Sequence, residues 1–415
     1  MHHSDYPLSE VPTSARKGLL STSAVLLGFT FFTATMWAGG TLGQAFPIGQ
    51  LLWIIVIGNL LLGMYAVALA YIACKSGLNS VLMGRFCFGE KGSKLSDFIL
   101  GFTQIGWYAW GTATIALVLV RTTGMPEWLE IPLMVLFGFG FCVTAMIGYR
   151  GMDWLSRFAV PAMMLFIVIS LFTGLVDVRG FAGLSQQTPT ESMSVAAAIT
   201  VIIGTFISGG TQATNWSRFA KTPKIAVIAT LAAFFVGNGL MVLTGALGTM
   251  IYQQADIVDV LIAQGFVTIA VLMLFLNIWT TQDNTIYNFA VAGCNLLRTE
   301  KRRLVTVGGA AIGTVLAVGG MYNLLIPFLV LLMGGVIMAD FWLKHKGRYP
   351  TLDKAQLPDF NRRGLAAYAL GAGAAYFSPL LPPLIGVVVA AGSYAVLLRL
   401  NHATLGDSLP STAKQ

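Results

Sequence analysis

Long apolar segments recur along the whole chain and leave few charged residues for a water-exposed surface. Only 10% of the 415 residues are charged and 56% are hydrophobic, whereas a soluble domain carries about 25% charged residues. A run of roughly 20 apolar residues is long enough to cross a bilayer as a helix. We therefore predict an all-α polytopic membrane protein with twelve transmembrane helices, at residues 18–43, 49–74, 97–120, 131–149, 155–176, 194–216, 224–251, 263–293, 304–321, 323–343, 364–380 and 383–400.

The basic residues are distributed very unevenly between the loops that join these segments. If the twelve spans alternate in direction, every Lys and Arg except Arg121 and Arg179 falls on one side of the membrane. Cytoplasmic loops carry such an excess of basic residues. We therefore expect a multi-pass protein of the cell inner (cytoplasmic) membrane with both termini cytoplasmic. The net charge of +8 then marks the cytoplasmic face and not a nucleic-acid surface, so the expected surroundings are the lipid bilayer and no nucleic acid.

The predicted spans divide the chain into six parts. Helices one to five and helices six to ten are expected to form a five-plus-five inverted repeat, followed by two extra C-terminal helices. The boundaries are a cytoplasmic N-terminal segment at 1–17, the first repeat at 18–178, the second repeat at 192–345, a cytoplasmic loop at 346–363, helices eleven and twelve at 364–400 and a cytoplasmic tail at 401–415. We recognise no ATP-binding loop in the sequence, so any transport must draw on an ion gradient or on a separate subunit.

Helices one and six carry matching clusters that favour a break in each helix. Phe31–Thr41 and Gly204–Thr211 each hold an aromatic residue, hydroxyl residues and Gly-Gly-Thr. Glycine lowers the cost of leaving a helix, and transporters with inverted repeats unwind corresponding helices near the midplane to bind substrate and ion. We predict that helices one and six are both broken. The alternative is that these small residues serve close packing between spans.

Helix eight contains the densest polar cluster of any apolar segment, at residues 277–284. Asp283 is the only acidic residue well inside a span, and a charged side chain there costs about 2.5–3.5 kcal/mol on insertion scales. Hydroxyl and carbonyl oxygens are hard ligands suited to a small cation. The helical period places Asn277, Thr280 and Thr281 on a common face. The cluster therefore indicates a functional site, and the alternative is a set of hydrogen bonds between helices.

Helix three offers an amide and an aromatic plane one turn apart. Gln104 can both donate and accept hydrogen bonds, and Trp107 supplies a flat π-face. Together with Phe206 of helix six, these residues could hold a planar heterocycle between them. The alternative is that the aromatic residues only pack between helices, which is how we interpret Tyr108 and Trp110.

An intramembrane enzyme is the competing class of protein. It would need a catalytic set of residues inside the spans. All four histidines lie outside the apolar segments, and the four cysteines are scattered without a C-x-x-C pair. One Asp and no His within the spans make such a set improbable, so we expect a transporter and no enzyme. A passive channel stays open as a further alternative, and ion-coupled accumulation of a solute would exclude it.

Several motifs, in order along most of the chain, resemble the nucleobase–cation symporter (purine/cytosine permease) family. They are Pro12–Gly18, Gly28–Phe32, Met36–Trp37, Ile57–Gly63, Thr103–Trp107, Phe206–Ser208, Asp256–Gly265, Asn277–Thr281 and Gly334–Ile337. The resemblance implies the five-plus-five fold with two extra helices. It also implies secondary active import of a nucleobase, with cytosine favoured, together with a coupled cation by alternating access.

The resemblance also implies which residues bind the two solutes. The base would stack between Trp107 and Phe206, with Gln104, Ser208 and Gln282 as its polar partners. The cation, with Na⁺ favoured, would be held by the carbonyls of Gly28, Phe32 and Asn277 and by the hydroxyls of Thr280 and Thr281. No prosthetic group is implied, and a monomer would be sufficient.

The chain departs from the pattern of this family at positions near the base. Gln282 stands where asparagine is typical and extends the amide by one methylene, and Ala213–Trp216 replaces a usual Asp-Phe pair. Trp110 and Thr112 replace small apolar residues. The alternative function is therefore a proton-coupled permease for another planar heterocycle, such as a purine, uracil or a hydantoin or allantoin, with a proton taken up near Asp283.

Overall fold

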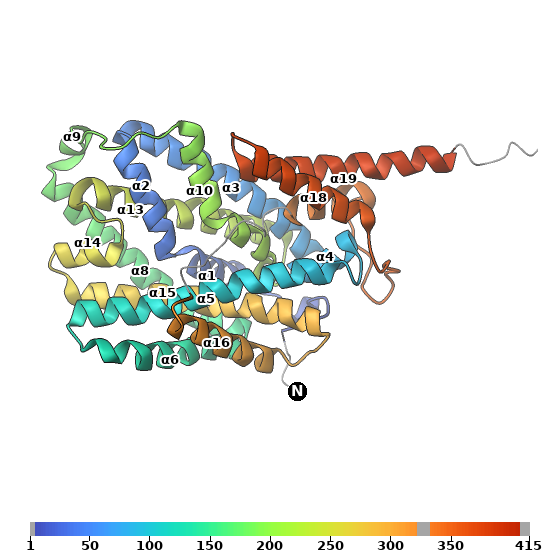
Figure 1. Cartoon of the computed structure of the whole chain (residues 1–415), viewed down its shortest axis with the longest axis horizontal. Helices are drawn as coiled ribbons and strands as arrows, with labels where there is room; N and C mark the ends of the chain where they lie inside the picture. Colours follow the sequence, from blue (N-terminus) through green and yellow to red (C-terminus); the bar gives the residue numbers. More distant parts are fainter. Residues whose placement is uncertain (1–4, 322–332, 407–415) are drawn as a thin grey trace, which may run out of the picture.

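The chain folds into a bundle of helices, which confirms the all-α prediction. The computed structural model describes residues 5–321 and 333–406, and within these ranges the only β-type pairing is one isolated bridge between Lys17 and Ala220. Figure 1 shows long helices lying roughly along the long axis of the molecule, with shorter ones at their ends. Because a helix satisfies its own backbone hydrogen bonds, this architecture suits the apolar interior of a bilayer.

The described helices follow most of the predicted spans closely. They are α1 Leu19–Thr30, α2 Thr33–Ala45, α3 Ile48–Ser76, α4 Ser80–Phe88, α5 Ser93–Thr123, α6 Glu130–Gly140, α7 Cys142–Ile147, α8 Tyr149–Asp177, α9 Gly180–Ser185, α10 Val195–Gln212, α11 Thr214–Ser217, α12 Pro223–Leu231, α13 Asn238–Tyr252, α14 Ile257–Ala263, α15 Val267–Leu297, α16 Arg302–Val318, α17 Met333–Ala339, α18 Arg362–Phe377 and α19 Pro382–Gly406. Short 3-10 turns at Thr13–Ala15 and Glu127–Leu129 and π-helical turns at Ala232–Gly237 and Asp340–Lys344 complete them.

Six of the described helical stretches are long and apolar enough to cross a membrane, or seven if the bent pair α1 and α2 counts as one span. The other predicted spans coincide with helices that are shorter, more polar or interrupted, such as α5 and α15, which carry the polar clusters. The predicted tenth span, at 323–343, lies partly outside the described residues, and only its last part is described, as α17 and the turn that follows it.

The break predicted in helix one is confirmed, and it lies at Phe31 and Phe32. Helices α1 and α2 meet there at an angle of 59°, and Phe32 has an extended backbone with φ of −135° and ψ of 126°. The Asn277 side chain stabilises the break because its Oδ1 accepts hydrogen bonds from the Thr33 amide and hydroxyl, at 3.2 and 2.7 Å. Its Nδ2 donates to the Phe31 carbonyl at 3.1 Å.

The break predicted in helix six is wrong at the place where we expected it. Helix α10 runs without interruption through Gly204–Thr211 and ends at Gln212, with one turn residue before α11. Two of its glycines, Gly209 and Gly210, serve close packing instead. A Cβ atom on Gly209 would lie 3.1 Å from the Phe29 ring of α1, and one on Gly210 would lie 3.0 Å from the Tyr65 ring of α3. Small residues at such contacts let helices in a membrane approach closely.

Gly39 and Gly40 of helix one also lie inside a regular helix, α2, and not in the break. A Cβ atom on Gly39 would lie only 2.0 Å from the Val242 carbonyl oxygen of α13. On the facing helix, a Cβ atom on Gly245 would lie 1.9 Å from the Met36 carbonyl oxygen. The two helices therefore pack through small residues on both sides, as the alternative interpretation of the Gly-Gly pair proposed.

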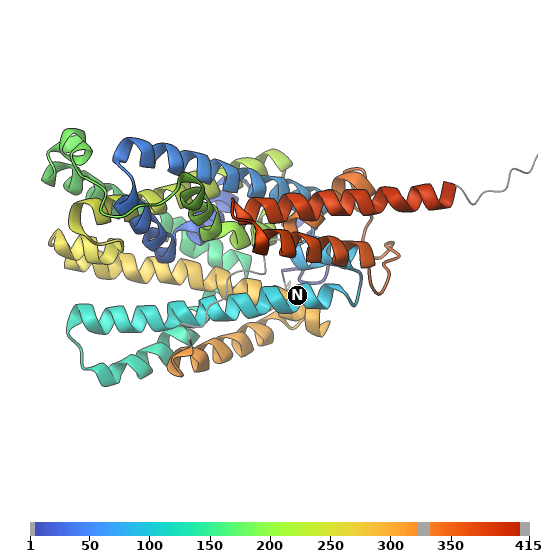
Figure 2. The same cartoon turned by 45° about the horizontal axis from the view of Figure 1, so that its top comes forward.

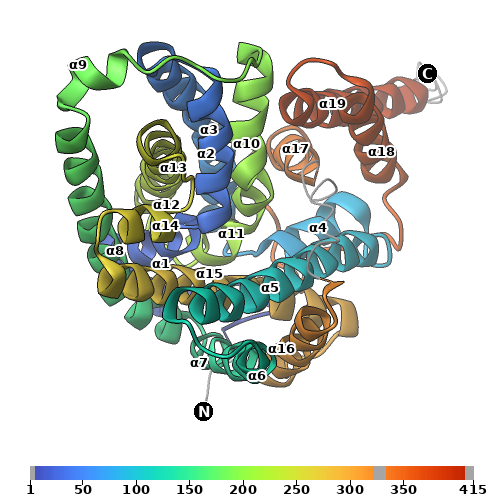
Figure 3. The same cartoon turned by 60° about the vertical axis from the view of Figure 1, so that its left-hand side comes forward.

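The elements around the centre of the bundle are α1, α5, α10 and α15. Helices α5 and α15 lie side by side along most of their length in Figures 1 and 2. Helices α18 and α19 form a pair at one edge of the bundle, next to α17, as Figure 3 shows. The centre is therefore built by helices from both predicted repeats, and the last two helices lie away from it.

Candidate substrate and cation site

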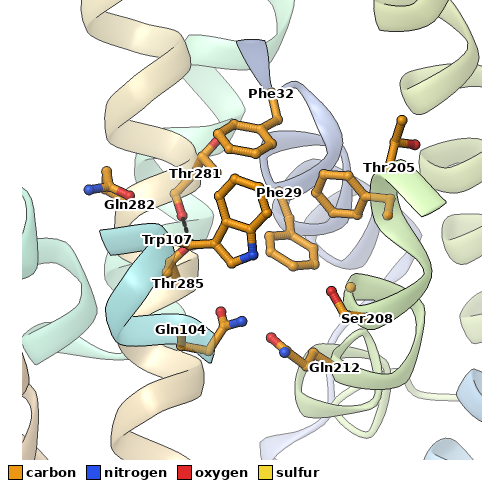
Figure 4. Close-up of a pocket in the computed structure, with 12 residues that line it drawn as sticks. Phe29, Phe32, Gln104, Trp107, Thr205, Ser208, Gln212, Thr281, Gln282 and Thr285 are labelled. Carbon is orange, nitrogen blue, oxygen red and sulfur yellow. Dashed lines mark hydrogen bonds between the residues drawn. The ribbon is translucent and has the colours of Figure 1, made fainter. Parts of the chain in front are cut away.

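A cavity lies beside the α1–α2 break, between the helices that carry the polar and aromatic clusters. It contains about 400 Å³ of space outside the protein atoms, including the solvent at its open side, and Figure 4 shows the side chains around it. The residues come from α1 and the break, α5, α10 and α15. They are Phe29, Phe32, Gln104, Trp107, Thr205, Phe206, Ser208, Gly209, Gln212, Thr281, Gln282 and Thr285.

All five residues proposed from the sequence as substrate ligands line this cavity. Gln104 and Trp107 come from α5, Phe206 and Ser208 from α10, and Gln282 from α15. These positions are far apart in the sequence, and the packing of three helices brings them together. The cavity therefore combines aromatic faces with amides and a hydroxyl, which is a suitable lining for a small polar ring.

Aromatic rings form one wall of the cavity. The Phe32 ring packs edge-on against Trp107 and Phe206, with ring centroids 5.4 and 6.2 Å apart. Phe29 packs edge-on against Phe206 at 4.9 Å. The break in helix one thus contributes Phe32 to the same aromatic cluster that α5 and α10 supply, so any movement at the break also moves the wall of the cavity.

Gln282 uses one end of its amide to bind α5. Its Nε2 donates to the Tyr108 carbonyl at 2.6 Å and contacts the Thr112 hydroxyl at 3.3 Å. Gly111 leaves the space for this longer side chain, because a Cβ atom there would lie 2.6 Å from the Gln282 amide carbon. The Gln282 amide is therefore held against α5 at the edge of the cavity.

Sequence reasoning missed several residues of the cavity, above all Gln212 and Thr285. Gln212 lies four residues after Ser208 in α10, and Thr285 lies four residues after Thr281 in α15. Residues four apart share a helical face. Helical periodicity extended from the residues already chosen would therefore have found both.

The residues proposed as cation ligands gather where α15 meets the break. The Thr281 hydroxyl contacts the carbonyls of Phe31 and Asn277 at 3.1 and 3.0 Å, and the Thr280 hydroxyl contacts the Asn277 carbonyl at 3.2 Å. The carbonyl that faces α15 is thus that of Phe31. The Phe32 carbonyl accepts a hydrogen bond from the Thr35 amide at 3.1 Å. Carbonyl and hydroxyl oxygens from two segments suit a hard cation.

Gly28 lies near the same place, in contact with α8 and α15. A Cβ atom on Gly28 would lie 2.6 Å from the Ser156 hydroxyl oxygen and 3.5 Å from the Thr280 Cβ. The Ser156 hydroxyl is fully buried and has no hydrogen-bond partner in the described part of the chain. Sequence reasoning did not single out Ser156, because one serine in an apolar span carries no signal of its own.

Asp283 faces away from the cavity, toward α7. Its carboxyl accepts hydrogen bonds from the Thr144 hydroxyl and from the Asn284 amide, both at 3.0 Å. Trp279 Nε1 in turn donates to the Thr144 hydroxyl at 3.2 Å. The carboxyl is completely buried, and the described residues form no salt bridge with it. Helix α15 therefore presents two polar faces, one to the cavity and break and the other to α7.

The fold is that of a known membrane transporter. A solved structure of Mhp1, a nucleobase-cation-symport-1 family transporter in a closed conformation with bromovinylhydantoin bound, superimposes with a TM-score of 0.83. The match covers 98% of this chain and 96% of Mhp1 at 18% sequence identity. The all-helical bundle with a central cavity beside a broken helix thus has the fold of Mhp1.

The chain belongs to the family of permeases for cytosine/purines, uracil, thiamine and allantoin, whose model matches residues 10–397. It is 38% identical to the cytosine permease of Escherichia coli strain K12 over 394 residues, which cover 93% of this chain and 92% of the relative. Over an alignment 422 positions long, it is 23% identical to the hydantoin permease of Microbacterium maritypicum, and the alignment covers 90% of this chain and 84% of that permease. The protein is a permease and not an enzyme.

Proposed function

We propose that this protein is a secondary active transporter that imports a nucleobase together with a cation by alternating access. The observation that carries the proposal is the cavity itself, in which Trp107, Phe206 and Gln104 surround a space directly beside the α1–α2 break. Cytosine is the first candidate substrate, since the cytosine permease of Escherichia coli is 38% identical over nearly the whole chain. The base would lie between Trp107 and Phe206, with Gln104, Ser208 and Gln282 as polar partners.

The coupled cation is Na⁺ in this proposal. It would bind the carbonyls of Gly28, Phe32 and Asn277 and the hydroxyls of Thr280 and Thr281, and the Phe31 carbonyl and the Ser156 hydroxyl are further oxygens close to these residues. Bound Na⁺ would hold the break in the geometry that completes the cavity. Coupling between two sites is reciprocal, so the base should tighten cation binding by the same factor.

The proposed membrane arrangement follows the charge distribution and the helix order. Twelve spans form a five-plus-five inverted repeat and two extra helices, in the cell inner membrane, with both termini cytoplasmic. The repeats comprise residues 18–178 and 192–345, the loop 346–363 and the segments 1–17 and 401–415 are cytoplasmic, and helices eleven and twelve occupy 364–400. One chain contains the whole cavity, so a monomer is sufficient for transport.

The second candidate is a proton-coupled permease for a purine, uracil or a hydantoin or allantoin. Two observations favour it. Gln282 reaches the cavity with a longer side chain than the asparagine typical of cytosine permeases, and the buried Asp283 carboxyl could carry a proton. A hydantoin permease is also among the relatives of this chain, which supports a hydantoin-like ring as the substrate of this second candidate.

Uptake into proteoliposomes tests both candidates. Radiolabelled cytosine is offered with an imposed inward Na⁺ gradient, with an inward proton gradient, or with neither, and unlabelled uracil, purines and hydantoin are added as competitors. We expect accumulation that requires Na⁺ and that unlabelled cytosine, added in a parallel sample, inhibits more strongly than any of these rings. Accumulation driven by protons would overturn the assignment of Na⁺ as the coupled cation. Stronger competition by another ring would make that ring the substrate in place of cytosine. Equilibration without accumulation under either gradient would indicate a passive channel.

A further inference from the structure

The cavity contains one amide, that of Gln212, to which the proposed function assigns no role. Gln212 lines the cavity at the end of α10, the residue is 1% exposed, and its Nε2 has no hydrogen-bond partner in the described part of the chain. A buried donor without an acceptor is costly, and buried polar groups in folded proteins are almost always paired. This nitrogen is therefore a donor available to a ligand.

The orientation of the Gln212 amide follows from a chain of hydrogen bonds that begins at a backbone group. The Ser80 backbone amide can only donate, and it contacts Asn215 Oδ1 at 3.2 Å. The Asn215 Nδ2 therefore points the other way, where it donates to Asn288 Oδ1 at 2.7 Å. The Asn288 Nδ2 is consequently the end that faces the cavity residues. An amide orientation is best assigned from such a network, and this one starts from a donor of fixed identity.

Asn288 in turn fixes two glutamines at the cavity. Its Nδ2 donates to Gln212 Oε1 at 2.5 Å, and Gln104 Oε1 lies 3.5 Å from the same nitrogen. Because both glutamine oxygens turn toward Asn288, both NH₂ groups are left for other partners. Figure 4 shows Gln104 and Gln212 facing each other along one side of the cavity, with Gln282 on another side.

We propose that Gln212 is a substrate-binding residue that donates a hydrogen bond to a carbonyl oxygen of the transported ring. Gln104 and Gln212 together select a ring edge that presents hydrogen-bond acceptors to α5 and α10. Asn288 is a positioning residue, since it sets the direction of both amides without lining the cavity. The inference rests on the proposed function, in which this cavity holds the base, and it adds which edge of the base faces which helices.

The test compares pairs of rings that differ by one carbonyl oxygen. Binding to the purified full-length protein in Na⁺ is measured by competition for cytosine against 4-aminopyrimidine, uracil against pyrimidin-4-one, and hydantoin against imidazolidin-2-one. The pair whose oxygenated member binds the unaltered protein most tightly is then used for the variants. Gln212→Met keeps the length of the side chain and removes the amide.

We expect Gln212→Met to weaken binding of the oxygenated ring about tenfold, which corresponds to about 1.4 kcal/mol, and to leave its counterpart unchanged. Asn288→Leu should reduce the same preference severalfold, because it frees both glutamine amides to rotate. Gln264→Met is the matched control, since that amide donates to the Ser170 carbonyl and the Tyr252 hydroxyl outside the cavity, and it should keep the preference of the unaltered protein.

Other results would count against the inference or against the function on which it rests. Equal weakening of both rings by Gln212→Met would mean a structural role, and no change in either would mean that Gln212 does not contact the substrate. Each of these two results overturns the inference while the proposed function stands. Failure of the unaltered protein to bind any of the rings would instead overturn the proposed function.

Discussion

Thr281 is the residue that connects the two parts of the candidate site. Its side chain lines the cavity, and its hydroxyl contacts the Phe31 carbonyl at the break and the Asn277 carbonyl of its own helix. A cation held by these oxygens would therefore be bound by a residue that also lines the cavity. Short distances of this kind allow one ligand to change the affinity of the other without a long chain of contacts.

Removal of the Thr281 hydroxyl should affect the cation more than the protein's stability. We expect Thr281→Ala to raise the Na⁺ concentration needed for half-maximal uptake about tenfold or more, because a hydrogen-bonding group that contacts a charge contributes about 1.5–3 kcal/mol. The measurement is the Na⁺ dependence of uptake in proteoliposomes, alongside the amount of protein that inserts.

Thr306→Ala is the matched control for this prediction. Thr306 is also buried, and its hydroxyl donates to the carbonyl four residues earlier in α16, away from the cavity. Its loss should leave the Na⁺ dependence unaltered. If Thr281→Ala transports with an unchanged Na⁺ dependence, the assignment of Thr281 to the cation is wrong.

At the residue scale, the sequence predicted those site residues whose chemistry is conspicuous in an apolar helix. Asn277, Thr280, Thr281 and Gln282 form a dense polar cluster, so the sequence marks them as candidates without a structure, and the resemblance to the family supplied their proposed roles. Ser156 was not found, because a single hydroxyl in a span is common, and Gln212 was not found, because the helical period was not followed one turn beyond Ser208. Their importance depends on unpaired atoms and near neighbours, which only the packing of α8, α10 and α15 defines.

At the scale of elements, α2 and α13 form a tightly packed pair through glycines on both helices. Gly39 and Gly245 each lie within 2.0 Å, measured from an ideal Cβ position, of a carbonyl oxygen on the facing helix. There is no room for a side chain at either place. The pair is therefore expected to move as one body, with the hinge at Phe31 and Phe32, where α2 joins α1.

Gly39→Ala should destabilise the protein through this contact. The added methyl would overlap the Val242 carbonyl, and overpacking of this kind costs about 1–3 kcal/mol. We expect a lower thermal unfolding temperature in detergent, measured by loss of monodisperse protein on heating. Gly308→Ala in α16 is the matched control, since a Cβ atom there meets nothing within 4 Å, and it should not lower that temperature. Equal stability of both variants would refute the packing role of Gly39.

At the scale of the whole molecule, the N-terminal segment connects parts of the bundle that are distant in sequence. The buried Arg218 guanidinium donates to the carbonyls of Asp5 and Tyr6 at 2.8 Å each. The Asp5 carboxyl accepts a hydrogen bond from the Tyr149 amide at 2.6 Å. This end of the molecule therefore joins α8, α11 and the start of the chain, on the side to which the charge pattern assigns the cytoplasm.

Cysteine labelling in intact cells tests the proposed orientation. The four native cysteines, Cys74, Cys87, Cys142 and Cys294, are all buried, so an introduced exposed thiol should react against a low background. A membrane-impermeant maleimide should label Ser185→Cys, in the exposed α9, and not Asp353→Cys, in the exposed loop before α18. After permeabilisation both should react. Labelling of Asp353→Cys from outside would reverse the orientation, and equal labelling of both in intact cells would invalidate the span count.

The sequence by itself determined that this chain is a helical membrane protein, because hydrophobic length and the absence of charge are properties of each segment alone. It also determined which helices carry polar and aromatic groups. Only the tertiary structure decided that helix one breaks at Phe31 and Phe32 while α10 continues through its glycines. The break depends on Asn277 of a distant helix, which satisfies the backbone groups that α1 and α2 leave open. The direction of the cavity amides likewise depends on contacts between four separate helices, which no local pattern encodes.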